Sequence, residues 1–212
     1  MAENVDDVAA CLVEVLGPVR PGRLQKLVYY AQAWHLADHS EPLFADDIEA
    51  RKNGPVVRRL HDQRRGRDGA TGGGRQGGGR QGGGARARPA GDPARLGQRA
   101  HAVLAWTVRS YGPLPDDELA RIVRIETPWR LARKGWLAAR RSGKVIDPKV
   151  MADYYRGLRT SAETAVQVAV GSARLEGYEF GPNSADRLRE VATGTRTADD
   201  VIAELVTRFG TP

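Results

Sequence analysis

The block Leu24-Gln-Lys-Leu-Val-Tyr-Tyr-Ala-Gln-Ala-Trp-His35 carries apolar side chains at every third or fourth position. When the block is wound as an α-helix, one face gathers Leu24, Leu27, Val28, Ala31 and Trp34. The spacing predicts a helix over residues 23–38 with this face turned toward a core.

Further helices are expected on both sides of this block. Residues 5–16 repeat apolar side chains with a helical period, and Gly17-Pro18 with Pro21-Gly22 predicts a turn between the two helices. After the block, residues 44–50 favour a short extended segment. Gly54-Pro55 then predicts the start of a short helix over residues 56–62.

The second half of the chain continues in the same way. Two helices are expected over residues 100–111 and 119–125, and two more begin at Pro128 and at Pro148. Three further helices are expected over residues 161–176, over 185–192 and after Thr197, which would cap the last one. Prolines fall in first turns, where the missing N–H costs nothing. The fold class expected is mainly α: a compact helical domain with at most a short β segment, followed by a C-terminal three-helix module.

A glycine- and arginine-rich tract over about residues 66–92 interrupts the chain. Residues 64–99 hold nine arginines and two aspartates, and this excess equals the net charge of +7 of the whole sequence. The tract has almost nothing to bury, so we expect a disordered insert that acts as a spacer. An RNA-binding tract is an alternative, but the tract lacks aromatic residues for base stacking. A local reading-frame slip is another.

Composition limits the remaining possibilities. The chain has 212 residues, of which 41% are hydrophobic, and no apolar run long enough to span a membrane. It starts without a signal-peptide pattern and has one cysteine, Cys11, so we expect a cytoplasmic protein. His35 and His39 have the spacing of two metal ligands on a helix, but no third ligand cluster follows, so no metal site and no cofactor are expected.

The N-terminal part resembles the Panacea (SocA-like) antitoxin domain. The resemblance rests on residues 24–35 and on the segments Pro42-Leu-Phe44, Ile48-Glu-Ala50, Gly54-Pro-Val-Val57, Glu126-Thr-Pro-Trp129, Ile146 and Met151-Ala-Asp-Tyr-Tyr-Arg156. It covers roughly residues 5–62 and 92–158. Two features depart from the family pattern: the glycine-arginine tract, and Arg51 where the family usually has an aromatic residue.

This resemblance implies an antitoxin that neutralises a partner toxin by direct contact and catalyses no reaction of its own. One kind in the family delivers its toxin to a protease. The aromatic residues Tyr29, Tyr30, Trp34 and Trp129 are interpreted most simply as core and rim residues of the domain. A contact patch for the toxin is the alternative, because tyrosine and tryptophan dominate interface hot spots.

A second motif lies near the C-terminus, Ser172-Ala-Arg-Leu-Glu176-Gly177. Ser172 and Glu176 are four residues apart, so they share one helix face. Gly177 follows where a helix ends most easily, because glycine adopts the left-handed cap conformation at little cost. The spacing therefore predicts a carboxylate presented at a helix end.

Residues 161–210 resemble the small VbhA-like antitoxins that inhibit Fic toxins. Besides the motif, the resemblance is carried by Tyr178-Glu-Phe180, Val191-Ala-Thr-Gly194 and Thr197-Ala-Asp-Asp-Val-Ile202. It implies that Glu176 pairs with the toxin arginine that seats the γ-phosphate of ATP, and that Ser172 bonds inside the same pocket. The stripe Val166, Ala169, Val170 and Ala173 would rest on the toxin or on the chain's own last two helices.

The hypothesis from the sequence is an antitoxin with two domains, one over residues 1–158 with the insert at 66–92 and one over 161–210. The chain lacks the Fic catalytic signature, so inhibition must act on another chain, a Fic-type AMP-transferase encoded nearby, in a heteromeric complex. Two alternatives remain open: an adaptor that delivers a toxin to a protease, and a nucleic-acid-binding protein that uses the arginine tract.

Overall fold

The computed structural model describes residues 2–63, 87, 89–134, 143–175, 177, 181, 183–193 and 195–209. The chain divides into two compact units, Met1–Tyr154 and Tyr155–Pro212. The described residues are mainly helical with one small sheet, which confirms the expected fold class. Among them, no helix is both long enough and apolar enough to cross a membrane.

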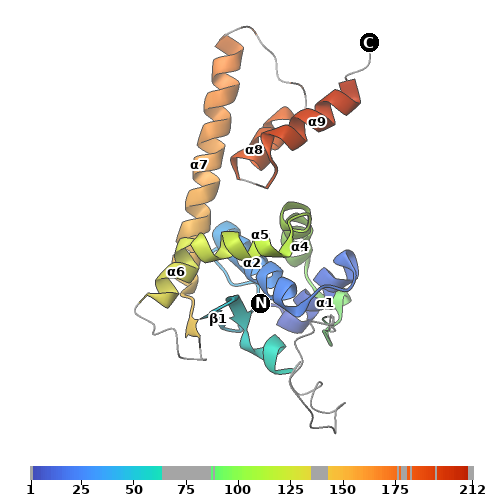
Figure 1. Cartoon of the computed structure of the whole chain (residues 1–212), viewed down its shortest axis with the longest axis vertical. Helices are drawn as coiled ribbons and strands as arrows, with labels where there is room; N and C mark the ends of the chain where they lie inside the picture. Colours follow the sequence, from blue (N-terminus) through green and yellow to red (C-terminus); the bar gives the residue numbers. More distant parts are fainter. Residues whose placement is uncertain are drawn as a thin grey trace. The chain divides into compact units, whose positions relative to one another are not determined.

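The first unit is built around α2 (Pro21–His39), which contains the block analysed above. Helices α1 (Val5–Leu16), α4 (Gln98–Tyr111) and α5 (Asp116–Ile125) and strand β2 (Gly54–Val57) all contact it (Figure 1). The five side chains expected to face inward, Leu24, Leu27, Val28, Ala31 and Trp34, are all buried. Positions on every side of α2 are buried, because elements on every side cover it.

Two glutamines of α2 explain how polar residues fit inside this core. The side-chain amide of Gln25 accepts a hydrogen bond from the Val57 N–H at 2.7 Å and donates one to the Val57 carbonyl at 3.4 Å. Gln32 accepts from the N–H groups of Leu43 (2.8 Å) and Phe44 (3.1 Å) and donates to the Phe44 carbonyl at 3.1 Å. Both amides therefore replace missing backbone partners of the segments that pack on α2.

The sheet has three antiparallel strands in the order β2-β1-β3, with β1 at Ile48–Arg51 and β3 at Lys144–Val145. Gly54-Pro55 does not start a helix, as the sequence pattern suggested, but opens β2, and helical backbone begins only at Arg58. Gly54 has φ +123°, and a Cβ there would meet Lys26 Cε at 3.5 Å and Val123 at 3.7 Å. This positive φ explains why the position holds glycine.

The last residues of the expected insert already belong to the first unit. Residues 64–86 and 88, which make up most of the expected insert, lie outside the described residues. The Ala87 N–H donates to the Val19 carbonyl at 2.8 Å, and the Asp92 N–H donates to Asp7 Oδ1 at 2.7 Å. A short 3-10 helix, η1 (Pro93–Arg95), follows and contacts α1. The end of the expected insert, residues 89–92, is therefore packed structure.

The remaining helices of this unit lie close to their expected positions. Helix α5 starts three residues earlier than expected, and α6 spans Thr127–Arg133. Since α2 precedes the tract and α4 and α5 follow it, their mutual packing shows that the tract interrupts one domain rather than joining two.

Helix α7 (Pro148–Leu175) is a single run of 28 residues, where the sequence pattern suggested one helix from Pro148 and a separate one from Ser161. The expected domain boundary between residues 158 and 161 falls inside it. Helices α8 (Ser184–Ala192) and α9 (Ala198–Phe209) follow in the second unit. Thr197 caps α9 as expected: its Oγ1 accepts from the Asp200 N–H at 3.1 Å, and Asp200 Oδ2 accepts from the Thr197 N–H at 3.2 Å.

Candidate functional site

The C-terminal motif lies at the end of α7. The helix ends at Leu175, and Gly177 has φ +84° with no atom within 4 Å of the place a Cβ would take. A glycine in this left-handed conformation just past a helix is a common way for a helix to stop. Ser172 is within α7, but its side chain and the whole of Glu176 lie outside the described residues.

The stripe upstream of the motif is partly covered. Val166 is buried, whereas Ala169, Val170 and Ala173 are half-buried. Val168 points elsewhere and is 63% exposed. The stripe thus has a covered start and a partly open end, which leaves room for both expected roles, packing on the chain itself and contact with a partner.

Helices α8 and α9 are joined by a cluster of charged side chains. The Arg187 guanidinium donates to Glu204 Oε1 at 2.8 Å, and Arg196 donates to Glu204 Oε2 at 2.6 Å and to Glu190 Oε2 at 3.4 Å. The hydrogen bonds from Arg196 and then Arg187 hold the pKa of Glu204 below its ordinary value. The pair of helices leaves apolar surface uncovered on α9, where Ile202 is 57% and Val206 is 59% exposed.

The first unit contains a buried polar cluster that the sequence did not reveal. The Tyr30 hydroxyl donates to Glu126 Oε1 at 3.2 Å, and Trp34 Nε1 donates to the Tyr111 hydroxyl at 3.0 Å. The rings of Tyr30 and Tyr111 are stacked with centroids 3.9 Å apart. Burial, followed by the charge of Glu126, raises the pKa of both tyrosines, so both hydroxyls stay protonated. The Tyr30 hydroxyl acts as a donor to Glu126, and the Tyr111 hydroxyl as an acceptor from Trp34.

Most of the aromatic residues proposed as a contact patch lie in or beside this buried cluster. Tyr29 and Tyr30 have no exposed surface and Trp34 is 2% exposed, so these three are core residues. The contact-patch alternative does not apply to them, because they offer a partner no surface. Trp129 keeps partial exposure, with the Arg133 guanidinium 5.2 Å from its ring centroid. Its Nε1 is buried without a hydrogen-bond partner among the described residues.

Arg51, at the end of β1, is held by a local ion pair. Its guanidinium lies 2.9 Å from Glu49 Oε2, and Arg58 binds the other carboxylate oxygen at 2.9 Å. Glu49 is buried, so the two arginines balance a charge that would otherwise be costly.

The two histidines of α2, which have the spacing of metal ligands, contact other protein groups. His35 Nδ1 lies 2.8 Å from the Glu41 carbonyl, to which it donates, and burial lowers the pKa of His35. The rings of His35 and His39 meet edge to face, 4.6 Å apart. Within the described part of the chain, no group of three or more His, Cys, Asp or Glu residues could hold a metal ion.

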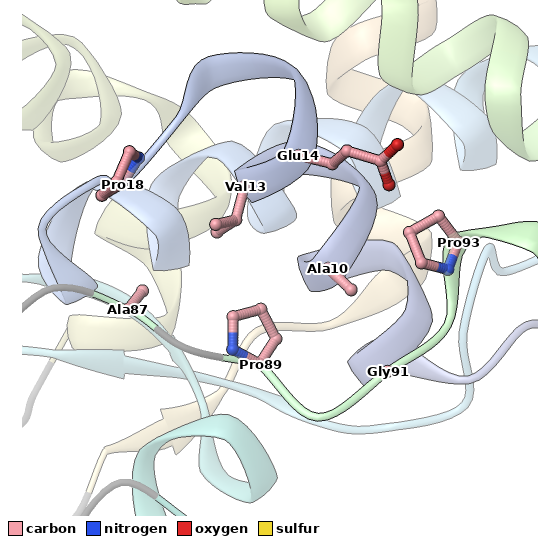
Figure 2. A pocket seen from close by; sticks show the side chains of 8 residues that line it. All are labelled: Ala10, Val13, Glu14, Pro18, Ala87, Pro89, Gly91 and Pro93. Carbon is pink, nitrogen blue, oxygen red and sulfur yellow. The ribbon is translucent and has the colours of Figure 1, made fainter.

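A groove of about 530 Å³ runs between α1 and the segment that follows the tract. Figure 2 shows α1 contributing Ala10, Val13 and Glu14, while Ala87, Pro89, Gly91 and Pro93 line the opposite side. Among the described residues that line the groove, Glu14 is the one that can titrate. Nearby Cys11 is buried, and burial and then Glu14 raise the pKa of its thiol, so it does not present a thiolate nucleophile.

The polar groups described above serve mostly to hold helices and strands together. Residues 24–130 match the family described as antitoxin SocA-like, Panacea domain. The match extends over half of the chain and across the tract, and the chain belongs to this family. No curated protein and no solved structure matches it.

Family membership places the chain among antitoxins, whose role is regulatory and whose partner is a toxin. The match ends at Arg130, in α6. Helices α7 to α9, which include the second motif, lie beyond the matched residues.

Proposed function

We propose that this protein is the antitoxin of a toxin–antitoxin pair and that its C-terminal unit inhibits a Fic-type AMP-transferase. The observation that carries the proposal is the end of α7: the helix stops at Leu175, and Gly177 takes a left-handed conformation. Glu176 stands between them in the sequence, and two further helices, α8 and α9, follow. This order is the one that the resemblance to VbhA-like antitoxins requires.

In this proposal Glu176 competes with the γ-phosphate of ATP for an arginine of the toxin. A carboxylate and a guanidinium form a planar pair with two hydrogen bonds, each worth about 1.5–3 kcal/mol. ATP then binds with its γ-phosphate displaced. Because in-line attack requires an aligned α-phosphate, AMP transfer stops while the nucleotide still binds.

Its neighbours have supporting roles. Ser172, one helical turn before Glu176, bonds inside the same pocket, and the half-buried Ala169, Val170 and Ala173 rest on the toxin. Small side chains at Ala169 and Ala173 permit a close approach of the helix. Gly177 lets the chain turn away without a side chain that would clash.

The test uses the full chain purified together with the Fic protein encoded nearby. Transfer of AMP from ATP labelled on the α-phosphate is measured for the wild-type chain, Glu176→Gly and Glu163→Gln. Glu163 is an exposed glutamate on α7 and serves as the matched control. We expect the complex to survive in all three, because one side chain is a small part of a standard interface, and transfer to return only in Glu176→Gly.

Full inhibition by Glu176→Gly would show that this carboxylate is not the blocking group. Toxin that disappears from cells only when a protease is active would instead indicate the adaptor alternative. Binding to nucleic acid that weakens steeply with salt and is lost on deletion of 66–86 would indicate use of the arginine tract.

A further inference from the structure

Helix α7 belongs to both units of the chain. Pro148–Tyr154 lies in the first unit and the rest of the helix, from Tyr155, in the second. Figure 1 shows α7 as one uninterrupted helix. The backbone hydrogen bonds of the second part therefore continue a ladder that starts in the first unit.

The start of α7 is fixed within the first unit. Ile146 is buried, and its N–H donates to the Ile48 carbonyl of β1 at 2.8 Å. Asp147 Oδ1 accepts from the Lys149 N–H at 2.8 Å, which satisfies one of the free donors of the first turn. Met151 and Ala152 are then buried in the core. The first turns of the helix are thus formed whenever the first unit is folded.

The second unit offers little support of its own. Among its described residues, the buried apolar side chains are Tyr155, Ala162 and Val166, and α8 buries no side chain. Larger apolar side chains such as Val168 and Ile202 are mostly exposed. A unit of this size with so few buried residues gains little free energy from a core.

These two facts decide how the C-terminal part of α7 forms. Starting a helix in water is unfavourable by a factor of about 1,000, and isolated helices shorter than about 12–15 residues are marginal. We propose that the Panacea domain nucleates the helix that carries Ser172 and leads to Glu176. Asp147 and Met151 are then positioning residues for the inhibitory segment. The consequence for inhibition rests on the proposed function, whereas the coupling of the two parts of α7 does not.

The coupling is tested by amide hydrogen exchange of the free, full-length chain. Ser161 is an exposed residue of α7 beyond the anchored turns, and Ser161→Pro interrupts the ladder there. Proline is tolerated in the first turn of a helix, so a self-sufficient second unit would keep residues 162–175 helical. We expect the protection of these amides to fall at least tenfold in Ser161→Pro and to persist in the control Ser161→Ala. Protection of α4 should be unchanged in both.

A second variant acts in the opposite direction. Gly157 is an exposed position of α7, and a Cβ there would meet no atom within 4 Å. Alanine favours an exposed helix interior over glycine, so Gly157→Ala should raise the protection of residues 159–175 by up to about fivefold. Protection that is the same in Gly157→Ala and wild type would count against the proposal.

Unchanged protection of residues 162–175 in Ser161→Pro would overturn the inference, because the second unit would then fold without the Panacea domain. Inhibition of the Fic protein provides the separate readout. If protection falls as expected while Glu176→Gly inhibits as well as wild type, nucleation stands and the proposed role of Glu176 fails. If protection falls in Ser161→Pro and inhibition is lost in Glu176→Gly, both proposals stand. Half inhibition of the Fic protein should then require at least tenfold more of the Ser161→Pro chain than of the wild-type chain.

Discussion

Replacing Gln32 by alanine tests whether its side-chain amide, here called the amide clamp, holds the segment Leu43-Phe44 against α2. The Gln32 side chain makes three hydrogen bonds to the backbone of Leu43 and Phe44, at 2.8, 3.1 and 3.1 Å. Both residues are buried, so water does not readily replace the lost partners. Each buried backbone group left without a partner costs about 1–3 kcal/mol. Three such groups give an expected loss of at least about 3 kcal/mol in the free energy of unfolding.

Urea unfolding followed by tryptophan fluorescence measures this loss. All four tryptophans of the sequence precede residue 155, so the signal reports on the first unit. Gln98→Ala, at an exposed position of α4, is the matched control and should change stability by no more than about 0.5 kcal/mol. If Gln32→Ala unfolds within about 0.5 kcal/mol of that control, the clamp does not stabilise the fold as argued.

Two further predictions concern other parts of the first unit. At Gly91 a Cβ would lie 2.1 Å from the backbone of Asp6, so Gly91→Ala should lower the free energy of unfolding by about 1–3 kcal/mol or more in the same assay. Gly22→Ala, whose Cβ would meet only Lys26 Nζ at the ordinary contact distance of 3.9 Å, is the control and should be nearly neutral. Burial alone would raise the pKa of Asp116, but hydrogen bonds and charges of Arg23 and Arg20 outweigh it and lower the pKa. A lowered pKa in the folded state means that the stabilisation is present at neutral pH and is lost as the pH falls below about 4; Asp116→Asn should therefore flatten the acid limb of stability measured against pH.

Local signals were enough to place most of the helices. The ends of α1 agree with the sequence pattern because Asn4 caps its first turn and Gly17-Pro18 cannot continue it. The strand at Gly54 could not be recognised, because it depends on pairing with β1 and on Gln25, residues that lie elsewhere in the sequence. The break expected near Ser161 also failed. Thr160 donates its hydroxyl to the Arg156 carbonyl at 3.1 Å, inside the helix, rather than capping a new one.

In the candidate site, too, local features could be predicted from the sequence, whereas contacts between distant residues could not. The left-handed conformation of Gly177 follows from its place after an apolar helical run, and the structure has it. The buried cluster of Tyr30, Trp34, Tyr111 and Glu126 could not be foreseen, because its members are brought together from positions as many as 96 residues apart. Spacing along one element reveals which residues share a face, but it does not reveal which faces meet.

The arrangement at the N-terminus of α1 explains how a domain accommodates the arginine-rich tract. On one side of the tract, Arg59 and Gln63 donate to Asp6 Oδ2, each at 3.0 Å. On the other side, the Asp92 N–H donates to Asp7 Oδ1 at 2.7 Å. Two consecutive aspartates thus bind residues on both sides of the tract, and the Ala87 N–H adds a bond to the Val19 carbonyl. With both ends fixed there, each doubling of the intervening length costs only about 0.6 kcal/mol in closure entropy. The Panacea fold therefore depends on these anchoring aspartates far more than on the length of the tract between them.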